Sequence, residues 1–193
     1  MKIKNVYFLK SCTKVSQFPQ YHYPEYAFIG RSNVGKSSLL NMILGSKSLV
    51  KTGSKPGVTK TINFFVVNDN MSFVDLPGFG YAKLPASVRE QFLPMIKSYI
   101  SNRKYLKLIF LLIDIRRKPG DEEIDLIKSI TTQKIPVVIT LTKCDKLSKN
   151  QLKTNIHTIC SVLDVDESSV FPTSSKSNLG KKDLLYLIEE YEA

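Results

Sequence analysis

Apolar residues along this chain gather in short runs that alternate with longer amphipathic segments. The runs predict strands near residues 3–9, 26–30, 61–67, 71–75, 107–114, 136–141 and 169–172. The amphipathic segments predict helices near residues 36–45, 87–102, 121–132, 149–163 and 181–190. Strands that alternate with helices indicate an α/β fold, in which a mostly parallel sheet carries helices on both faces.

Local residues refine this picture. Asn68-Asp69-Asn70 separates two strand-like runs and predicts a tight hairpin, hence one antiparallel pair. Residues 1–10 mix lysines with apolar positions and predict an edge strand of the domain, because they lack the continuous apolar stretch of a signal peptide. With 193 residues and 42% hydrophobic content, we expect a single domain spanning residues 1–193 with six to seven strands.

Two features of the sequence concern the location of the protein in the cell. The longest apolar run, residues 108–113, is much shorter than the roughly 18 residues of a membrane span. Cys12, Cys144 and Cys160 are odd in number and share no C-x-x-C spacing, so we interpret them as reduced thiols. We expect a cytoplasmic monomer without a stable membrane association.

The octet Gly30-Arg31-Ser32-Asn33-Val34-Gly35-Lys36-Ser37 directly follows an apolar run. Glycines at its two ends let the backbone bend, so that successive N–H groups form a cradle for phosphate oxygens at the start of a helix. Lys36 could reach the β- and γ-phosphates, and the Ser37 hydroxyl could ligate Mg²⁺. The alternative is a glycine-rich turn without a ligand, which the motifs further along the chain disfavour.

Two further segments fit a γ-phosphate. Asp75-Leu76-Pro77-Gly78 ends a predicted strand, where Asp75 could hold Mg²⁺ through water and the Gly78 N–H could meet the γ-phosphate. Thr59, in Gly57-Val58-Thr59, could ligate Mg²⁺ and bond the γ-phosphate only when a triphosphate is bound. Residues 46–60 and 76–86 lack periodicity, and we expect both segments to respond to hydrolysis.

Thr142-Lys143-Cys144-Asp145 follows a buried strand and indicates the base. The Asp145 carboxylate can accept hydrogen bonds from the N1–H and the 2-amino group of guanine, and adenine offers no such pair of donors. The Lys143 stem would cover one face of the base, and Ser174-Ser175-Lys176 would supply a backbone N–H to guanine O6. Thr142 stands where Asn is more common, so one guanine contact stays open.

In this order the motifs GRSNVGKS, PGVT, DLPG, TKCD and TSSK resemble the translation-factor-like (TRAFAC) GTPases. Residues 28–41, 56–65, 75–82 and 112–116 are similar, more narrowly, to the EngB family, also called YihA or YsxC, and the resemblance spans essentially the whole chain. It implies a Ras-like P-loop domain that hydrolyses GTP to GDP and phosphate. It also implies a nucleotide-dependent switch that assists assembly of the large ribosomal subunit, contacting rRNA and ribosomal proteins, with a role in cell division and septation.

The matching motif positions form the candidate site. For magnesium these are Ser37, Thr59 and Asp75, and for catalysis Lys36, Thr59, Gly78 and Asn33. For GTP or GDP they are Gly30, Arg31, Ser32, Asn33, Val34, Gly35, Lys36, Ser37, Ser38, Gly57, Val58, Thr59, Lys60, Thr61, Asp75, Leu76, Pro77, Gly78, Thr142, Lys143, Cys144, Asp145, Thr173, Ser174, Ser175 and Lys176.

One position in the sequence predicts slow hydrolysis of GTP. Phe79 stands where Ras-like enzymes place a glutamine that orients the attacking water, and a phenyl ring cannot hydrogen-bond to water. We therefore expect a partner or a monovalent cation to assist. Asn33 occupies the place where related GTPases coordinate potassium (K⁺); alternatively, it only caps the turn.

The distribution of positive charge suggests a binding partner besides the nucleotide. The chain carries a net +11, and residues 1–60 contain ten Lys and Arg but one Glu, a net +9. A basic segment of this kind suits a polyanion such as rRNA, because neutralised phosphates release counterions. A general enrichment of lysine would explain the same charge. A GTP-dependent regulator of division or of a membrane process, without a ribosomal partner, is the alternative function.

Overall fold

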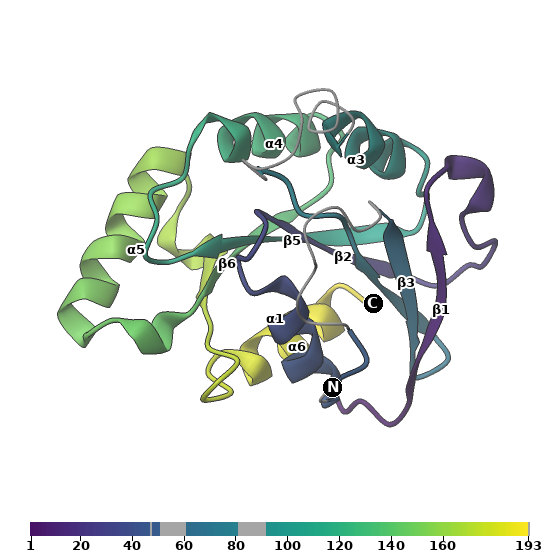
Figure 1. The fold of residues 1–193 in the computed structure, drawn as a ribbon, viewed down its shortest axis with the longest axis horizontal. Helices are drawn as coiled ribbons and strands as arrows, with labels where there is room; N and C mark the ends of the chain where they lie inside the picture. The colour runs from purple at the N-terminus through teal and green to yellow at the C-terminus, as the bar shows by residue number, and fades with distance from the viewer. Residues whose placement is uncertain (47, 51–60, 81–91, 193) are drawn as a thin grey trace.

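The computed structural model describes residues 1–46, 48–50, 61–80 and 92–192 (Figure 1). Seven strands of this part form one sheet in the order β1-β3-β4-β2-β5-β6-β7. Their bounds are β1 (Val6–Cys12), β2 (Glu25–Gly30), β3 (Ile62–Val67), β4 (Met71–Asp75), β5 (Leu106–Asp114), β6 (Val137–Thr142) and β7 (Val170–Pro172). Within this sheet only β3 runs against the others, pairing antiparallel with both β1 and β4.

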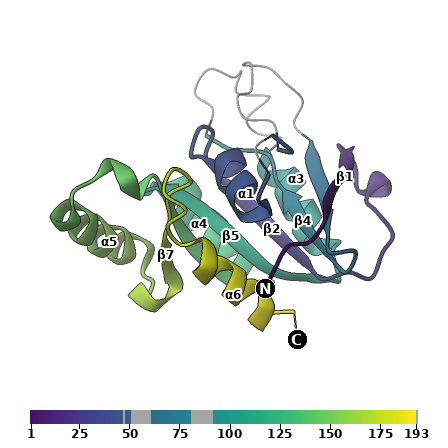
Figure 2. The same cartoon turned by 90° about the horizontal axis from the view of Figure 1, so that it is seen from below.

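Helices cover both faces of the sheet, as Figures 1 and 2 show. In the described residues the α-helices are α1 (Lys36–Leu44), α3 (Phe92–Ser101), α4 (Asp121–Thr131), α5 (Lys149–Leu163) and α6 (Lys181–Glu190), and the short 3₁₀ turns are η1 (Val15–Gln17), η2 (Cys144–Lys146) and η3 (Glu167–Ser169). Helices α1 and α6 contact each other on one face, and α3 and α4 do so on the other. This is the α/β architecture that the sequence predicts, a mostly parallel sheet with helices on both faces.

Two hydrophobic cores lie on opposite faces of the sheet. One joins α3, α4 and α5 to residues such as Ile109 and Leu111 of β5, and the other joins α1 and α6 to Phe110 and Leu112 of the same strand. Because neighbouring residues of a strand point to opposite faces, a strand covered on both sides needs apolar side chains at consecutive positions. The uninterrupted run in β5 is therefore the sequence signature of this two-sided burial.

Most predicted boundaries agree with the structure, and the first strand is the exception. It spans Val6–Cys12 and not residues 3–9, although it is the predicted edge strand. The preceding residues are held by the Asn68 side chain: its Oδ1 accepts from Lys4 N at 2.7 Å, and its Nδ2 donates to Lys2 O at 3.0 Å. Hydrogen bonds from a distant side chain leave no periodic signal in the sequence, so the hydropathy pattern predicts a strand that begins too early.

The predicted hairpin is present between β3 and β4. Asn68 and Asp69 have φ values of 52° and 56°, the left-handed conformation that tight hairpin turns favour. The expected antiparallel pair is thus confirmed, and the β1 pairing along the other edge of β3 adds a second one. The β1 ladder is irregular between Phe8 and Lys10, where Leu9 forms a bulge.

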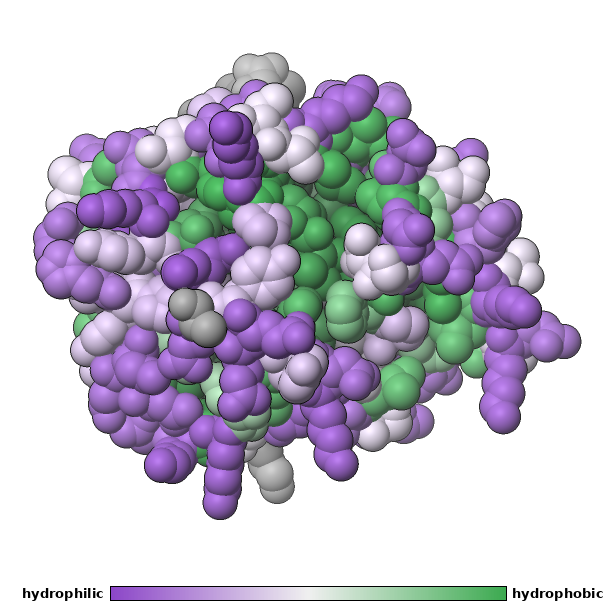
Figure 3. Space-filling model, turned by 180° about the vertical axis from the view of Figure 1, so that it is seen from behind, coloured by the Kyte–Doolittle hydropathy of each residue, from purple (hydrophilic) through white to green (hydrophobic). Residues whose placement is uncertain are grey.

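The remaining predictions concern the helix at residues 87–102, the three cysteines and membrane spans. The described part of the predicted helix 87–102 begins at Phe92, and residues 87–91 lie outside the described residues. Cys12, Cys144 and Cys160 are buried and form no disulfide. Among the described helices none is long and apolar enough to cross a membrane. Seen from behind, hydrophobic residues cross the middle of the molecule between hydrophilic side chains (Figure 3).

Candidate functional site

The carboxyl ends of four strands place the candidate motifs at one edge of the sheet. In the parallel register Phe28 pairs with Asp75, Gly30 with Leu112, and Asp114 with Thr142. Strands β2, β4, β5 and β6 consequently end side by side. In open α/β sheets ligands bind beside such strand ends, and GRSNVGKS, DLPG and TKCD begin at the ends of β2, β4 and β6.

The predicted phosphate-binding turn, residues 30–37, joins β2 to α1 and is called the phosphate turn below. It needs both of its glycines. A Cβ at Gly30 would lie 2.7 Å from Leu112 O, too close for any other residue. Gly35 has φ 105° and precedes α1, and it offers no side-chain acceptor to the first helical turn. The N–H groups that begin a helix then remain for a ligand, and the helix dipole favours an anion there.

Lys36 and Asp75 meet directly beside this turn. The Lys36 ammonium forms an ion pair with Asp75 Oδ1, and the two side chains are 12% and 10% exposed. The other carboxylate oxygen accepts from Asn63 Nδ2 at 3.3 Å. Ser37 follows in the first turn of α1. The fold therefore gathers the predicted phosphate-binding lysine and two of the predicted magnesium ligands.

The segment after β4 lies on the phosphate turn. Ser32 N donates to Phe79 O at 2.9 Å, and Phe79 N donates to Gly30 O at 3.3 Å. A Cβ at Gly78 would approach Ser32 N and Cα to 3.3 Å, so this position favours glycine. Leu76, Pro77 and the Phe79 ring are buried. The Phe79 side chain belongs to the core under α3, so it does not reach water beside the turn.

The TKCD motif is tied to the phosphate turn by two side chains. Thr142 Oγ1 donates to Val34 O at 2.6 Å, and Lys143 Nζ donates to Asn33 O at 2.7 Å. Lys143 itself adopts a left-handed backbone with φ 63°, which turns the chain sharply out of β6. Thr142 thus uses its hydroxyl to hold the turn.

Asp145 is fixed by the TSSK segment. Ser174 Oγ donates to Asp145 Oδ1 at 2.7 Å, and this hydrogen bond lowers the pKa of Asp145, so the carboxylate stays ionised at neutral pH. Lys146 Nζ lies 3.8 Å from Oδ2. An oriented carboxylate of this kind can accept the two N–H groups on the edge of guanine.

Cys144 and Thr173 lie behind the site and not at its surface. Both are buried. Thr173 donates to Leu141 O through its backbone N at 2.6 Å and through Oγ1 at 2.9 Å, while Cys144 N donates to Thr173 O at 3.1 Å. Burial raises the pKa of the Cys144 thiol to about 11. These two residues join the TKCD and TSSK segments, so we expect them to support the nucleotide site indirectly.

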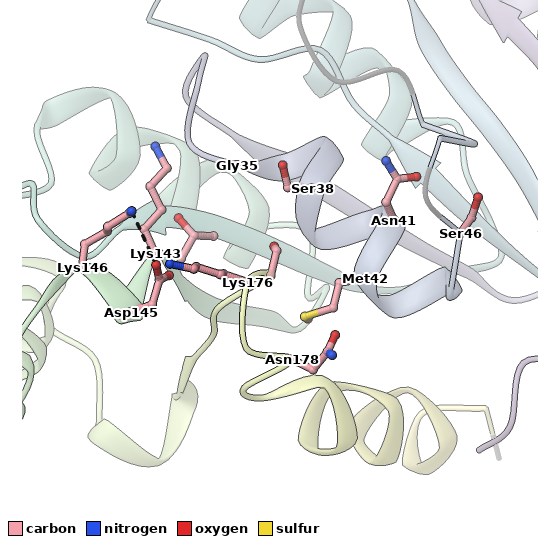
Figure 4. Close-up of a pocket in the computed structure, with 12 residues that line it drawn as sticks. Gly35, Ser38, Asn41, Met42, Ser46, Lys143, Asp145, Lys146, Lys176 and Asn178 are labelled. Atoms are coloured by element: carbon pink, nitrogen blue, oxygen red, sulfur yellow. Dashed lines mark ion pairs between the residues drawn. The ribbon is translucent and has the colours of Figure 1, made fainter.

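A cavity of about 550 Å³ lies between α1 and the TKCD and TSSK segments (Figure 4). Its volume falls in the roughly 300–1,000 Å³ range of small-molecule sites. Predicted residues that line it are Gly35, Ser38, Thr142, Lys143, Asp145, Ser175 and Lys176, and residues that sequence reasoning missed are Asn41, Met42, Ser46, Lys146 and Asn178. The missed residues lie in the second half of α1 or in turns that follow the motifs, and no spacing rule marks them.

Some residues that were predicted for the nucleotide site do not line this cavity. The Arg31 side chain points to α4, where its NH1 lies 2.6 Å from Glu122 Oε2 and its NH2 donates to Gly80 O at 3.5 Å, so only its backbone stays at the turn. Thr61 precedes β3 and donates to Asn63 Oδ1 at 3.1 Å. Residues 57–60, with Thr59, lie outside the described residues. So do most of residues 46–60 and residues 81–86 of the two segments expected to respond to hydrolysis.

Removing the Thr142 hydroxyl should weaken the fold measurably. Thr142→Val keeps the shape but leaves Val34 O without this donor in a buried position, and we expect about 1–3 kcal/mol lower unfolding free energy in urea. Thr154→Val is the matched control, because its hydroxyl also bonds a backbone oxygen but lies exposed on α5. Equal losses for the two variants would contradict the role assigned to Thr142.

Comparison with known proteins identifies a family model and several relatives that this chain matches. Residues 25–143 match the model of a family described as 50S ribosome-binding GTPase. A probable GTP-binding protein EngB of Desulforapulum autotrophicum is 51% identical over 95% of each chain. The chain belongs to the EngB family of GTP-binding proteins. Another EngB relative, from Geotalea daltonii, is 43% identical over 98% of this chain and 92% of its own.

The fold agrees with a solved EngB structure. The crystal structure of a probable GTP-binding protein EngB aligns with a TM-score of 0.73 at 26% identity, covering 87% of this chain and 98% of that chain. The resemblance noted in the sequence and the predicted Ras-like fold are thereby confirmed. This EngB-family chain is a GTP-binding protein and an enzyme that hydrolyses GTP.

Proposed function

We propose that this EngB-family GTPase is a nucleotide-dependent switch that binds the large ribosomal subunit during its assembly in the cytoplasm. The observation that carries the proposal is a second cavity, of about 510 Å³, formed by residues 1–6, the end of α1 and the start of α6. Lys2, Lys4 and Lys181 line it, and its lining contains no Asp or Glu. The description of the matching family as ribosome-binding supports the same partner.

The charge of this cavity suits an RNA backbone. Lys2 and Lys4 are exposed, and the segment that carries them is held in place by Asn68. Lysines that neutralise phosphates gain free energy from counterion release, and prior ordering of the chain reduces the entropy lost on binding. A role in cell division and septation, which the family resemblance implies, would follow if the supply of large subunits limits growth.

Co-sedimentation with purified large subunits tests this proposal. We expect salt-sensitive binding that is stronger with a non-hydrolysable GTP analogue. The triple variant Lys2→Ala, Lys4→Ala and Lys181→Ala should bind at least about tenfold more weakly, with a salt slope lower by about three. The matched control changes the same charge at exposed Lys128, Lys149 and Lys153 of α4 and α5. Equal weakening in both variants, or no binding by the wild type, would refute the proposal.

We propose residue roles for the nucleotide site on the same basis. Ser37 and Asp75 offer the oxygen donors that Mg²⁺ prefers, with Thr59 as the third expected ligand. Bound Mg²⁺ would neutralise charge on the β- and γ-phosphate oxygens. Lys36 and the N–H groups of the turn would add to that neutralisation, and Asp145 would select guanine. The buried Phe79 ring cannot orient water, which supports slow intrinsic turnover.

Potassium is the proposed aid to hydrolysis. Asn33 lies exposed on the phosphate turn with φ 63°, and its backbone oxygen already accepts from Lys143. A cation held by its side chain would supply positive charge near the transferred phosphoryl group. We expect hydrolysis at least about tenfold faster in KCl than in NaCl, and Asn33→Ala should abolish the difference. Asn150→Ala on exposed α5 should preserve it. Equal rates in the two salts would remove potassium from the proposal.

A further inference from the structure

Asp114 carries a buried charge whose role the motifs leave unassigned. It is the last residue of β5, lies beside Thr142 in the sheet register, and its side chain is 7% exposed. Its carboxylate accepts from Arg116 N at 3.1 Å, Arg116 Nε at 2.9 Å and Arg116 NH2 at 2.7 Å. Burial alone would raise the pKa of Asp114, but these bonds and one from Lys143 hold it well below its usual value. The group is an anion throughout the physiological pH range.

The same carboxylate fixes the Lys143 ammonium. Lys143 Nζ lies 2.9 Å from Asp114 Oδ2 and 2.7 Å from Asn33 O, so it bridges the end of β5 and the phosphate turn. Its stem passes beside Gly35, where a Cβ would lie 3.7 Å from Lys143 Cε. The side chain is thereby extended along the wall of the nucleotide cavity (Figure 4).

We propose that Asp114 is a positioning residue for guanine-nucleotide binding: it holds Lys143 extended, so that the stem forms one wall for the base while the ammonium anchors the phosphate turn. The proposal rests on the nucleotide-site roles given above. A lysine stem has many rotamers, and fixing its far end before binding removes part of the entropy that binding would otherwise cost. Asn33 O alone supplies one neutral acceptor, whereas Asp114 supplies a charged one.

Dissociation of a fluorescent GDP analogue measures this effect. Asp114→Asn keeps the size and one acceptor oxygen but removes the charge, and we expect release about tenfold faster. Lys143→Met keeps the stem and removes the ammonium. In the Lys143→Met background, Asp114→Asn should then change the rate by no more than about twofold, because the partner is gone.

Arg116→Gln is the matched control on the other side of the carboxylate. It removes one partner of Asp114 and leaves the contact with Lys143, so release should stay within about twofold of the wild-type rate. Should Asp114→Asn fail to fold, Asp114→Glu retains the charge with a displaced carboxylate and should release the analogue at an intermediate rate. The same acceleration by Asp114→Asn in both Lys143 backgrounds would overturn the proposal, as would an unchanged rate with Lys143 present. A wild type that binds no guanine analogue would instead refute the nucleotide site itself.

Discussion

Asp145→Asn is expected to weaken GTP and GDP binding by at least about a hundredfold while improving the binding of xanthine nucleotides. In the proposed site the carboxylate would accept from N1–H and the 2-amino group of guanine, whereas an amide at the same place presents one acceptor and one donor. Xanthine carries an oxygen where guanine carries the amino group, so it matches the amide. Competition of each nucleotide against a fluorescent GDP analogue gives both affinities.

The fold should tolerate this change, because Asn retains the oxygen that accepts from Ser174. The matched control is Asp164→Asn, an exposed Asp at the end of α5 with φ 53°, a conformation that Asn also adopts readily. It should leave both affinities unchanged. If Asp145→Asn binds GTP as tightly as the wild type, then base selection does not depend on this carboxylate.

Lys36→Met is expected to lower the rate of GTP hydrolysis by roughly 10²–10³-fold. Methionine preserves most of the stem but removes the charge that would neutralise the β- and γ-phosphates in the transition state, and interactions of this type account for losses of that size. Phosphate release under single-turnover conditions, with enzyme in excess and at a concentration that binds all of the GTP, separates this effect from weaker binding.

The variant also leaves Asp75 without its ion-pair partner in a position that is 10% exposed, so its thermal unfolding must be recorded alongside. Lys149→Met, exposed in the first turn of α5, controls for the loss of one lysine. Hydrolysis at the wild-type rate by a folded Lys36→Met protein would show that this lysine does not act on the phosphates.

Much of the fold could be predicted because local signals and burial agree. The apolar run of β5 is covered on both faces, and Asn68-Asp69 has the backbone that a tight hairpin needs. The phosphate turn could also be predicted from local residues. A close backbone approach requires glycine at Gly30, and a positive φ favours it at Gly35. These features depend on residues near one another in the chain.

The features that could not be predicted depend on pairs far apart in the chain. The Arg31 side chain meets Glu122 of α4, and Asp114 meets Lys143. Neither pair has a spacing rule, because the sheet order brings the partners together. The late start of β1 has the same origin, a clamp by Asn68 some sixty residues away. Sequence motifs thus indicate a candidate site, whereas the long-range contacts of Arg31 and Asp114 required the structure.

The bulge at Leu9 has a consequence for self-association. β1 forms one border of the sheet, and Tyr7 and Phe8 there are 46% and 49% exposed. A straight border of this kind would template strand addition by a neighbouring copy and lead towards fibrils. The extra residue twists the backbone out of register, and Lys10 beside it adds like-charge repulsion between approaching copies. We therefore expect the protein to carry aromatic rings on its outermost strand without loss of colloidal stability.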